Sequence, residues 1–312
     1  MSGPKARYTT RHISSSPTTI ASQDSQTLTL ADGRYLGFAE YGDRNGPAIF
    51  YFHGWPGSRL EAALGDTAGK KLGARLIGVD RPGMGISSFQ PNRRLLDWPA
   101  DVSQLARHLK LDRYRVVGGS GGGPYALACA KALPREELRG VGVVAGFGPW
   151  YMGTSGMTIQ GRIMFNVMAW LPSATRLLFE RTAVPAAQNP DRQVFTKMLT
   201  EAFQQLKGPD RAVFEDEKTL EITIEAMRES YKQGSSGIVK EFQLLTSPWG
   251  FQLEDITFDK VKLWYGTEDK NTPVMMGRET AKRLQYAQLK EYPGDTHWTI
   301  FANHLEEILR DI

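Results

Sequence analysis

The middle of the chain carries a glycine cluster around a single serine: residues 116–124 read Val-Val-Gly-Gly-Ser-Gly-Gly-Gly-Pro, and the serine is Ser120. An apolar run at 114–117 precedes the cluster, and a helix-forming run at 125–132 follows it. A strand, a sharp turn and a helix, with Gly-x-Ser-x-Gly at the turn, form the context in which a serine hydroxyl projects above a sheet as a nucleophile. We therefore interpret Ser120 as a nucleophile held on a strained turn.

The neighbouring glycines fit this interpretation. Gly118 and Gly122 stand two residues either side of Ser120 and leave room for a tight turn. The start of the following helix would place the N–H of Gly121 where negative charge develops on a reacting oxygen. A plain glycine-rich turn or a phosphate cradle is the alternative, although the Lys-Ser/Thr ending of a P-loop is missing.

Composition and charge are those of an ordinary globular protein. The chain has 312 residues, of which 41% are hydrophobic and 23% charged, enough for one large domain or two smaller ones. The net charge is only +4 and no basic run is present, so we expect no nucleic-acid partner. No stretch approaches 18 uninterrupted apolar residues, so no integral membrane span is predicted.

The cellular compartment is predicted from weak signals. The single cysteine, Cys129, lies in an apolar helical run and cannot form an internal disulfide, so we expect a cytoplasmic protein with a buried, inert thiol. Residues 1–23 carry three basic residues and no acidic one, which faintly resembles an organelle-targeting segment. We favour the interpretation that residues 1–25 are a disordered or loosely packed tail.

Alternating strands and helices predict the fold class. Continuous apolar runs typical of strands buried on both faces lie at 48–52, 76–79, 141–145 and 261–265. A hairpin pattern at 27–39 precedes them, a further strand is predicted at 289–292, and helical patterns separate the runs. This order indicates an α/β fold with a mostly parallel sheet flanked by helices on both faces.

A long helical segment interrupts this alternation. Residues 150–245 contain helical patterns and no convincing strand. We therefore predict an α/β core at 26–149 and 246–312, with a helical cap inserted at 150–245. The run at 164–171 is unusually apolar. It is either packed into a core or forms the underside of a lid over an apolar substrate.

A nucleophilic serine needs a base and a carboxylate that orients the base. Of the five histidines, His297 lies in a loop after the last predicted strand, where α/β sheets place their chemistry. Asp269 follows the strand at 261–265, which gives the order Ser120, Asp269, His297 along the chain. We predict these three as the catalytic residues.

Two neighbouring carboxylates compete with Asp269 for the orienting role. Glu268 precedes it by one residue and would project to a different side of an extended loop. Asp295 lies two residues before His297, too close along the chain to meet the imidazole without bending the loop. Both are read as solvated turn residues.

Five motifs, taken in order, resemble the α/β-hydrolase superfamily, in the branch that includes esterases, proline iminopeptidases, C–C hydrolases and epoxide hydrolases. They are His-Gly-Trp-Pro-Gly-Ser at 53–58, Asp-Arg-Pro-Gly-Met-Gly at 80–85, the serine turn at 118–122, the acid loop at 266–273 and Gly-Asp-Thr-His at 294–297. The resemblance covers residues 26–312 and implies an α/β-hydrolase fold with a helical cap.

The resemblance also implies roles for particular residues. The oxyanion hole would be formed by the backbone N–H groups of Trp55 and Gly121, and His53, Asp80 and Arg81 would hold the loops. The acid loop of the family supports Asp269 as the orienting carboxylate. The resemblance does not extend to the apolar detail of the cap; as a separate prediction, the candidate substrate-binding residues are Met164, Phe165, Met168 and Trp298.

The nucleophile type selects the expected chemistry. Epoxide hydrolases and haloalkane dehalogenases attack with aspartate, so Ser120 argues against both. The expected function is an esterase-like serine hydrolase for small or medium apolar esters, acting through an acyl-enzyme with no cofactor and no metal ion. The alternatives are a non-hydrolytic ligand-binding or lyase-like relative and a proline-iminopeptidase-like aminopeptidase. The latter needs an acid in the cap to hold a substrate ammonium; the candidates are Glu180, Glu201, Glu215, Asp216 and Glu217.

Overall fold

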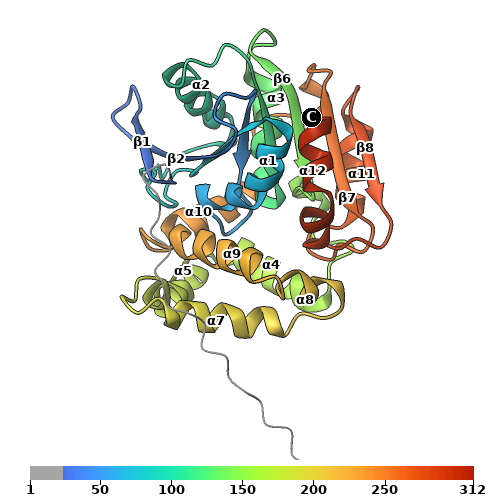
Figure 1. The fold of residues 1–312 in the computed structure, drawn as a ribbon. Coiled ribbons are helices and arrows are strands. Elements are labelled where there is room, and N and C mark those ends of the chain that lie inside the picture. The colour runs from blue at the N-terminus through green and yellow to red at the C-terminus, as the bar shows by residue number, and fades with distance from the viewer. Residues whose placement is uncertain (1–23) are drawn as a thin grey trace, which may run out of the picture.

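The computed structural model describes residues 24–312, so the predicted tail at 1–25 and the possible targeting segment at 1–23 lie almost wholly outside the described residues. Within this range eight strands form one sheet (Figure 1). The strands are β1 (Gln26–Thr29), β2 (Tyr35–Gly42), β3 (Ala48–Phe52), β4 (Arg75–Val79), β5 (Tyr114–Gly119), β6 (Leu138–Val144), β7 (Val261–Gly266) and β8 (Gln288–Tyr292).

The sheet is mostly parallel, with strand order β1-β2-β4-β3-β5-β6-β7-β8. β2 pairs antiparallel with β1 and β4, whereas the pairs from β4 through β8 are parallel. β3 lies beside β5, with Phe52 opposite Gly118. The loop after β3 and the serine turn after β5 therefore leave the sheet side by side.

Helices cover both faces of the sheet. One face packs against α2 (Trp98–His108), α3 (Gly123–Ala132) and α11 (Val274–Arg283), and the other against α1 (Asp66–Leu72) and α12 (Thr299–Asp311). Successive strand residues point to opposite faces: Phe50 and Phe52 belong to the first cluster, Ile49 and Tyr51 to the second. The predicted doubly covered parallel sheet is confirmed.

A helical insertion connects β6 to β7 and lies below the sheet in Figure 1. It contains α4 (Ile159–Trp170), α5 (Pro172–Arg181), α6 (Ala183–Ala187), α7 (Gln193–Gln204), α8 (Pro209–Val213), α9 (Glu217–Ser230) and α10 (Ser236–Leu245). No strand occurs between residues 150 and 245, as predicted. Over the described range, every helix is too short or too polar to span a bilayer.

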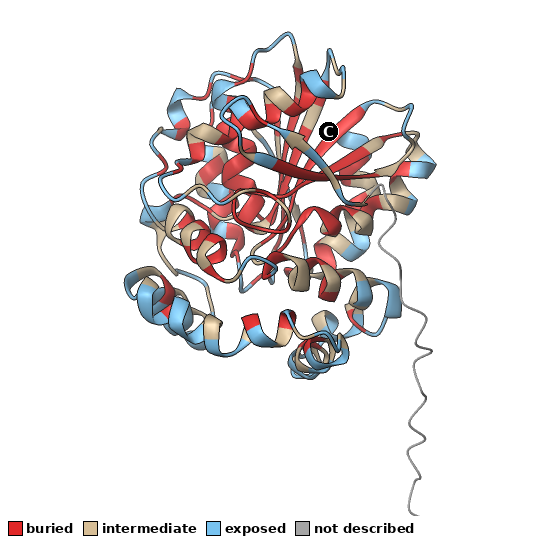
Figure 2. Cartoon of the chain, turned by 90° about the vertical axis from the view of Figure 1, so that its left-hand side faces the viewer, coloured by how far each residue is buried: buried red, intermediate tan, exposed pale blue. Residues whose placement is uncertain are grey.

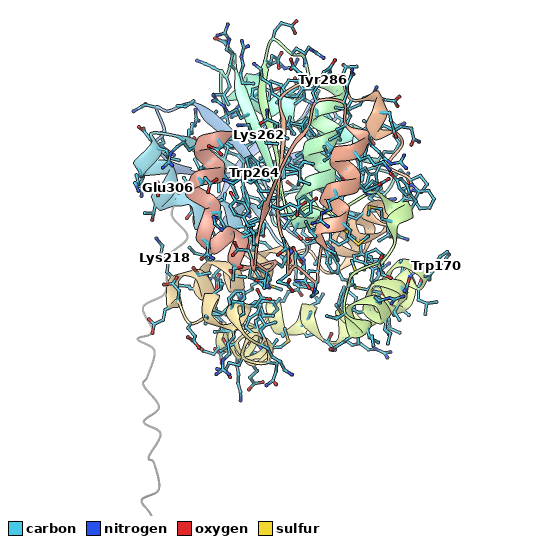
Figure 3. The ribbon with its side chains drawn as sticks, turned by 90° about the vertical axis from the view of Figure 1, so that its right-hand side faces the viewer. Trp170, Lys218, Lys262, Trp264, Tyr286 and Glu306 are labelled. Atoms are coloured by element: carbon cyan, nitrogen blue, oxygen red, sulfur yellow. The ribbon has the colours of Figure 1, made fainter. Side chains whose placement is uncertain are left out.

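The insertion is less buried than the core. Figure 2 shows buried residues concentrated in the strands and their covering helices, with much of the insertion exposed. On α4, Met168 is buried, whereas Ile163 and Trp170 are exposed, and Trp170 projects from the margin of the molecule in Figure 3. Of the apolar run at 164–171, therefore, only part is packed as a protein core would be.

Helix α10 fastens the insertion to the core. The fully buried carboxylate of Glu241 forms ion pairs with Arg81 and Arg93 and accepts a hydrogen bond from the hydroxyl of Tyr125 at 3.1 Å. Leu245 joins the core cluster beneath. Because α10 also contacts α4 and α5, it packs against both parts, and the division of the chain at residue 245 stays a prediction.

Candidate active site

Ser120 stands on a strained turn directly after β5. Its backbone φ is +50°, a left-handed conformation that non-glycine residues rarely adopt. A Cβ added to Gly118 would lie 2.2 Å from the carbonyl oxygen of Gly122, and one added to Gly122 would lie 2.2 Å from that of Phe52. The two glycines are therefore sterically required, and strain at the serine is typical of a functional turn.

The loops after β7 and β8 bring Asp269 and His297 together. Oδ2 of Asp269 lies 2.8 Å from Nδ1 of His297, and both side chains are buried. Oδ1 of Asp269 accepts backbone N–H bonds from Asn271 and Thr272 at 2.7 and 2.8 Å. These bonds hold the carboxylate in one orientation, with its second oxygen directed at the imidazole.

The environment of His297 has two opposing effects on its pKa. Burial disfavours the imidazolium, but the charge of Asp269 and its hydrogen bond outweigh burial, so the pKa is raised above the ordinary value for histidine. With Asp269 facing Nδ1, the neutral ring carries its proton on Nδ1 and leaves Nε2 as an acceptor. This tautomer is the one a general base requires.

The two competing carboxylates lie elsewhere. Glu268 is exposed and lies 3.5 Å from the ammonium of Lys270. Asp295 accepts hydrogen bonds from His304 Nε2 at 2.7 Å and from the Asn303 amide at 3.0 Å. Of the three carboxylates near these loops, only Asp269, which was the one predicted for the orienting role, touches His297.

Thr272 is a site residue that the sequence analysis missed. Its hydroxyl lies 2.8 Å from Asp269 Oδ2, 3.1 Å from His297 Nδ1 and 2.7 Å from the carbonyl oxygen of Ala145. The Asp-x-x-Thr spacing at 269–272 could have indicated this contact, because aspartate commonly accepts N–H bonds from residues just after it in a turn.

The predicted oxyanion donors also lie close together. A Cβ on Gly121 would be 3.3 Å from the backbone nitrogen of Trp55. The loop that carries Trp55 is held by Arg81, whose guanidinium donates to the carbonyl oxygens of His53 at 2.6 Å and Gly54 at 3.0 Å. Burial, with the nearby charge of Arg81, lowers the pKa of His53 well below its ordinary value, so this histidine stays neutral.

Ser120 and His297 line one cavity of about 630 Å³ between the core and the insertion. The four predicted substrate-binding residues, Met164, Phe165, Met168 and Trp298, line it as well. Phe242 extends the apolar wall, with ring centroids 4.8 Å from Trp55 and 5.2 Å from Phe165. Whether substrate contacts these side chains stays a prediction.

Acidic residues of the insertion do not line this cavity. Glu180, the first of the five candidates for binding an ammonium, accepts hydrogen bonds from the backbone and hydroxyl of Ser235. The other four are also absent from the cavity lining. Across residues 24–312, no cluster of three or more His, Cys, Asp or Glu side chains is arranged to hold a metal ion.

Glu61 is a second residue that the sequence analysis missed. It belongs to a 3₁₀ helix at Arg59–Gly65 and lines the same cavity. Burial raises its pKa, although bonds from the N–H of Gly54 and the hydroxyl of Tyr51 oppose this effect. The sequence carries no signal for its position, because the turn of the loop before it decides where the side chain points.

Comparison with known proteins identifies the family. The sequence profile of the family described as alpha/beta hydrolase fold matches residues 47–303. The chain belongs to this family. The predicted family and fold of the described chain are thereby confirmed.

Two curated proteins resemble parts of this alpha/beta hydrolase. A non-heme chloroperoxidase from Streptomyces lividans is 32% identical over 121 residues, which are 38% of this chain and 44% of that protein. A proline iminopeptidase from Xanthomonas citri is 33% identical over 109 residues, which are 33% of this chain and 34% of that protein. The matched region thus spans less than half of either relative.

Solved structures of the fold extend over nearly the whole chain. An esterase from Rhodococcus sp. ECU1013 has a TM-score of 0.62 at 18% identity, covering 92% of this chain and 96% of that one. Several other solved structures that match at similarly low identity are also esterases. At this identity the likeness shows a shared fold.

Proposed function

We propose that this alpha/beta hydrolase is a serine hydrolase that cleaves small or medium apolar esters through an acyl-enzyme. One observation carries the proposal: a strained serine, Ser120, and a histidine paired with a buried carboxylate, His297 with Asp269, face one apolar cavity. A nucleophile, a base and an orienting acid are the three roles that acyl transfer needs.

In the first half of the reaction, the Oγ of Ser120 attacks the ester carbonyl carbon while Nε2 of His297 takes the hydroxyl proton. Asp269 keeps the imidazole in the required tautomer and stabilises the imidazolium. The N–H groups of Trp55 and Gly121 donate to the oxyanion of the tetrahedral intermediate. The intermediate collapses as His297 returns the proton to the leaving alcohol, which leaves an acyl-serine.

In the second half, a water molecule replaces the alcohol. His297 removes a proton from this water, whose oxygen attacks the acyl carbon, and the same donors stabilise the second oxyanion. Collapse of this intermediate breaks the bond to Ser120 Oγ, which regains its proton from His297. The carboxylic acid leaves and the enzyme returns to its starting state.

The cavity supports an apolar substrate of limited size. About 630 Å³ falls within the range typical of small-molecule sites, and the cavity wall includes Phe165, Met168 and Phe242. Burying apolar surface there stabilises a hydrocarbon acyl chain by about 25 cal/mol per Å².

An aminopeptidase is the second candidate, and two observations favour it. The Xanthomonas citri relative is a proline iminopeptidase, and the Glu61 carboxyl in the cavity could hold a substrate ammonium. This carboxyl belongs to the core, whereas the five acids predicted from the sequence lie in the insertion. Amino-acyl amides are therefore part of the test below.

The test has two parts. A fluorophosphonate probe should label the wild-type protein, and the Ser120→Ala variant should lose both labelling and turnover. Panels of acyl esters, lactones and amino-acyl amides should give the highest kcat/KM with an apolar ester. Labelling that survives Ser120→Ala would place the nucleophile elsewhere, and faster cleavage of amino-acyl amides than of any ester would favour the aminopeptidase.

A further inference from the structure

Glu61 faces the nucleophile, yet the proposed mechanism gives it no task. A Cβ placed on Gly54 would lie 3.5 Å from Oε2 of Glu61 and 3.6 Å from the Cβ of Ser120. The carboxyl and the serine therefore border the same small space. A polar group of a substrate bound at Ser120 can reach Glu61 from there.

The two oxygens of Glu61 have different surroundings. Oε1 accepts hydrogen bonds from the hydroxyl of Tyr51 and the backbone N–H of Gly54, both at 2.9 Å. Oε2 accepts none from any residue in the described range 24–312. Oε1 therefore helps to hold the loop at 53–57, whereas Oε2 can accept a hydrogen bond from a ligand.

The electrostatics of the site favour a donor at this oxygen. Burial raises the pKa of Glu61, because removal from water disfavours the charged carboxylate. Glu61 is half-buried and lines the cavity, so Oε2 is open to the space that a substrate would occupy. A donor brought by the substrate would satisfy Oε2 and stabilise its charge.

We propose that Oε2 of Glu61 accepts a hydrogen bond from a hydroxyl or amino group on the substrate, close to the scissile carbonyl. This inference rests on the proposed function and narrows its substrate class to esters whose apolar acyl chain carries one such donor. Glu61 is then a specificity-determining residue, and the donor group distinguishes preferred substrates from plain esters.

The Glu61→Gln variant distinguishes the roles of the two carboxylate oxygens. Its amide oxygen can still accept from Tyr51 and Gly54, whereas its NH₂ group replaces the free acceptor. Gly54→Ala is a second variant that removes no hydrogen bond: its methyl would meet Glu61 and Ser120 at ordinary contact distances and would fill the space for the donor. Glu137→Gln is the matched control, since Glu137 accepts from the hydroxyl of Tyr114 at 3.1 Å outside the cavity lining.

The experiment compares ethyl butyrate with ethyl 2-hydroxybutyrate and ethyl 2-aminobutyrate, both enantiomers of each, by pH-stat. For the wild type and Glu137→Gln, kcat/KM should be about tenfold or more higher for one substituted ester than for ethyl butyrate, as expected for a hydrogen bond to a charged group. Glu61→Gln and Gly54→Ala should both remove this preference. Which ester is preferred distinguishes a hydroxyl from an amino donor.

Two results would overturn the inference: a wild type that prefers ethyl butyrate to both substituted esters, or a preference that Glu61→Gln and Gly54→Ala leave unchanged.

Absence of both ester turnover and fluorophosphonate labelling would instead refute the proposed function. In that case, calorimetric titration of Ser120→Ala with butyramide, 2-hydroxybutyramide and 2-aminobutyramide still tests Glu61. One substituted amide should bind about tenfold more tightly than butyramide, and Ser120→Ala/Glu61→Gln should abolish the difference; equal affinities would refute the inference.

Discussion

The imidazole of His297 owes its basicity to its immediate neighbours. Burial alone would lower its pKa and weaken it as a proton acceptor, but the carboxylate of Asp269 at 2.8 Å reverses that effect. Asp269 is itself held by two backbone N–H groups and touches the hydroxyl of Thr272. Among the charges that raise the pKa of the proposed base, Asp269 therefore has the largest effect, and its carboxylate is held in one orientation.

Asp269→Asn should lower kcat for a turned-over ester by about 10⁴, the loss found when an orienting aspartate becomes asparagine in a serine protease. The amide cannot both hold the tautomer and stabilise the imidazolium. Glu268→Gln and Asp295→Asn should stay within about tenfold of wild type, because neither side chain touches His297. A normal Asp269→Asn beside an impaired Asp295→Asn would reassign the acid.

The pH profile should show the titration of His297. Only the neutral imidazole accepts the serine proton, so kcat/KM should fall as the pH decreases through the pKa of the free enzyme. Because that pKa is raised, the midpoint should lie above the ordinary value of about 6.5. In Asp269→Asn, which removes the largest effect that opposes burial, the midpoint of the residual activity should move down. A wild-type rate that is flat from about pH 5 to 8, measured where chemistry limits turnover, would contradict the assignment.

Among the elements, helix α10 links the insertion to the loops of the site. Its Glu241 pairs with Arg81, and Arg81 holds the carbonyl oxygens of His53 and Gly54 next to the proposed oxyanion donor. One buried carboxylate on the insertion thereby supports a loop of the core. Removing it would affect stability and loop geometry together.

Glu241→Ala should destabilise the fold by about 3–5 kcal/mol, because it leaves two buried guanidinium groups without their carboxylate. Urea unfolding followed by tryptophan fluorescence gives the free energy of unfolding. Glu215→Ala, which removes an exposed carboxylate 3.9 Å from Arg211, is the control and should have little effect. Equal stability of the two variants would show that the buried network contributes little.

In the whole molecule, the cavity lies where the insertion meets the carboxyl ends of the strands. The core supplies Ser120 and His297, and the insertion supplies Phe165 and Met168. A buried substrate is therefore enclosed by segments that are far apart in the chain. We therefore expect the insertion to determine the size of substrate that is accepted, and the core to determine the reaction that is catalysed.

Activity on a homologous series of acyl esters should rise with chain length until the cavity is filled. Each added CH₂ contributes up to about 0.8 kcal/mol, or about fourfold in kcat/KM. Phe165→Ala should move the optimum to a longer chain, since loss of the ring enlarges the cavity and leaves Ser120 and His297 unchanged. An enzyme that prefers acetate to all longer acyl groups would contradict an apolar cavity of this size.

Local sequence patterns were sufficient to predict the main secondary-structure elements and the order of the site residues along the chain. The apolar run at 48–52 forms β3 without a shift at either end, and the serine turn forms where the glycines allow a positive φ at Ser120. Such features are encoded by neighbours in the chain, because buried parallel strands must be apolar and a tight turn must exclude side chains. The positions of the site loops could then be predicted, because the carboxyl ends of parallel strands lie at the same edge of a sheet.

What the sequence determined by itself is the α/β frame, the serine on its turn and the three loops that carry Ser120, Asp269 and His297. The tertiary structure decided which carboxylate meets the imidazole, which acid enters the cavity and which face of α4 looks inward. Glu61 and the acids of the insertion look alike in the sequence, and Asp269 has two acidic neighbours. Only the packing of loops from distant strands places one carboxylate at 2.8 Å from His297 and another beside Ser120, because hydrogen bonds and burial act between residues that the chain keeps far apart.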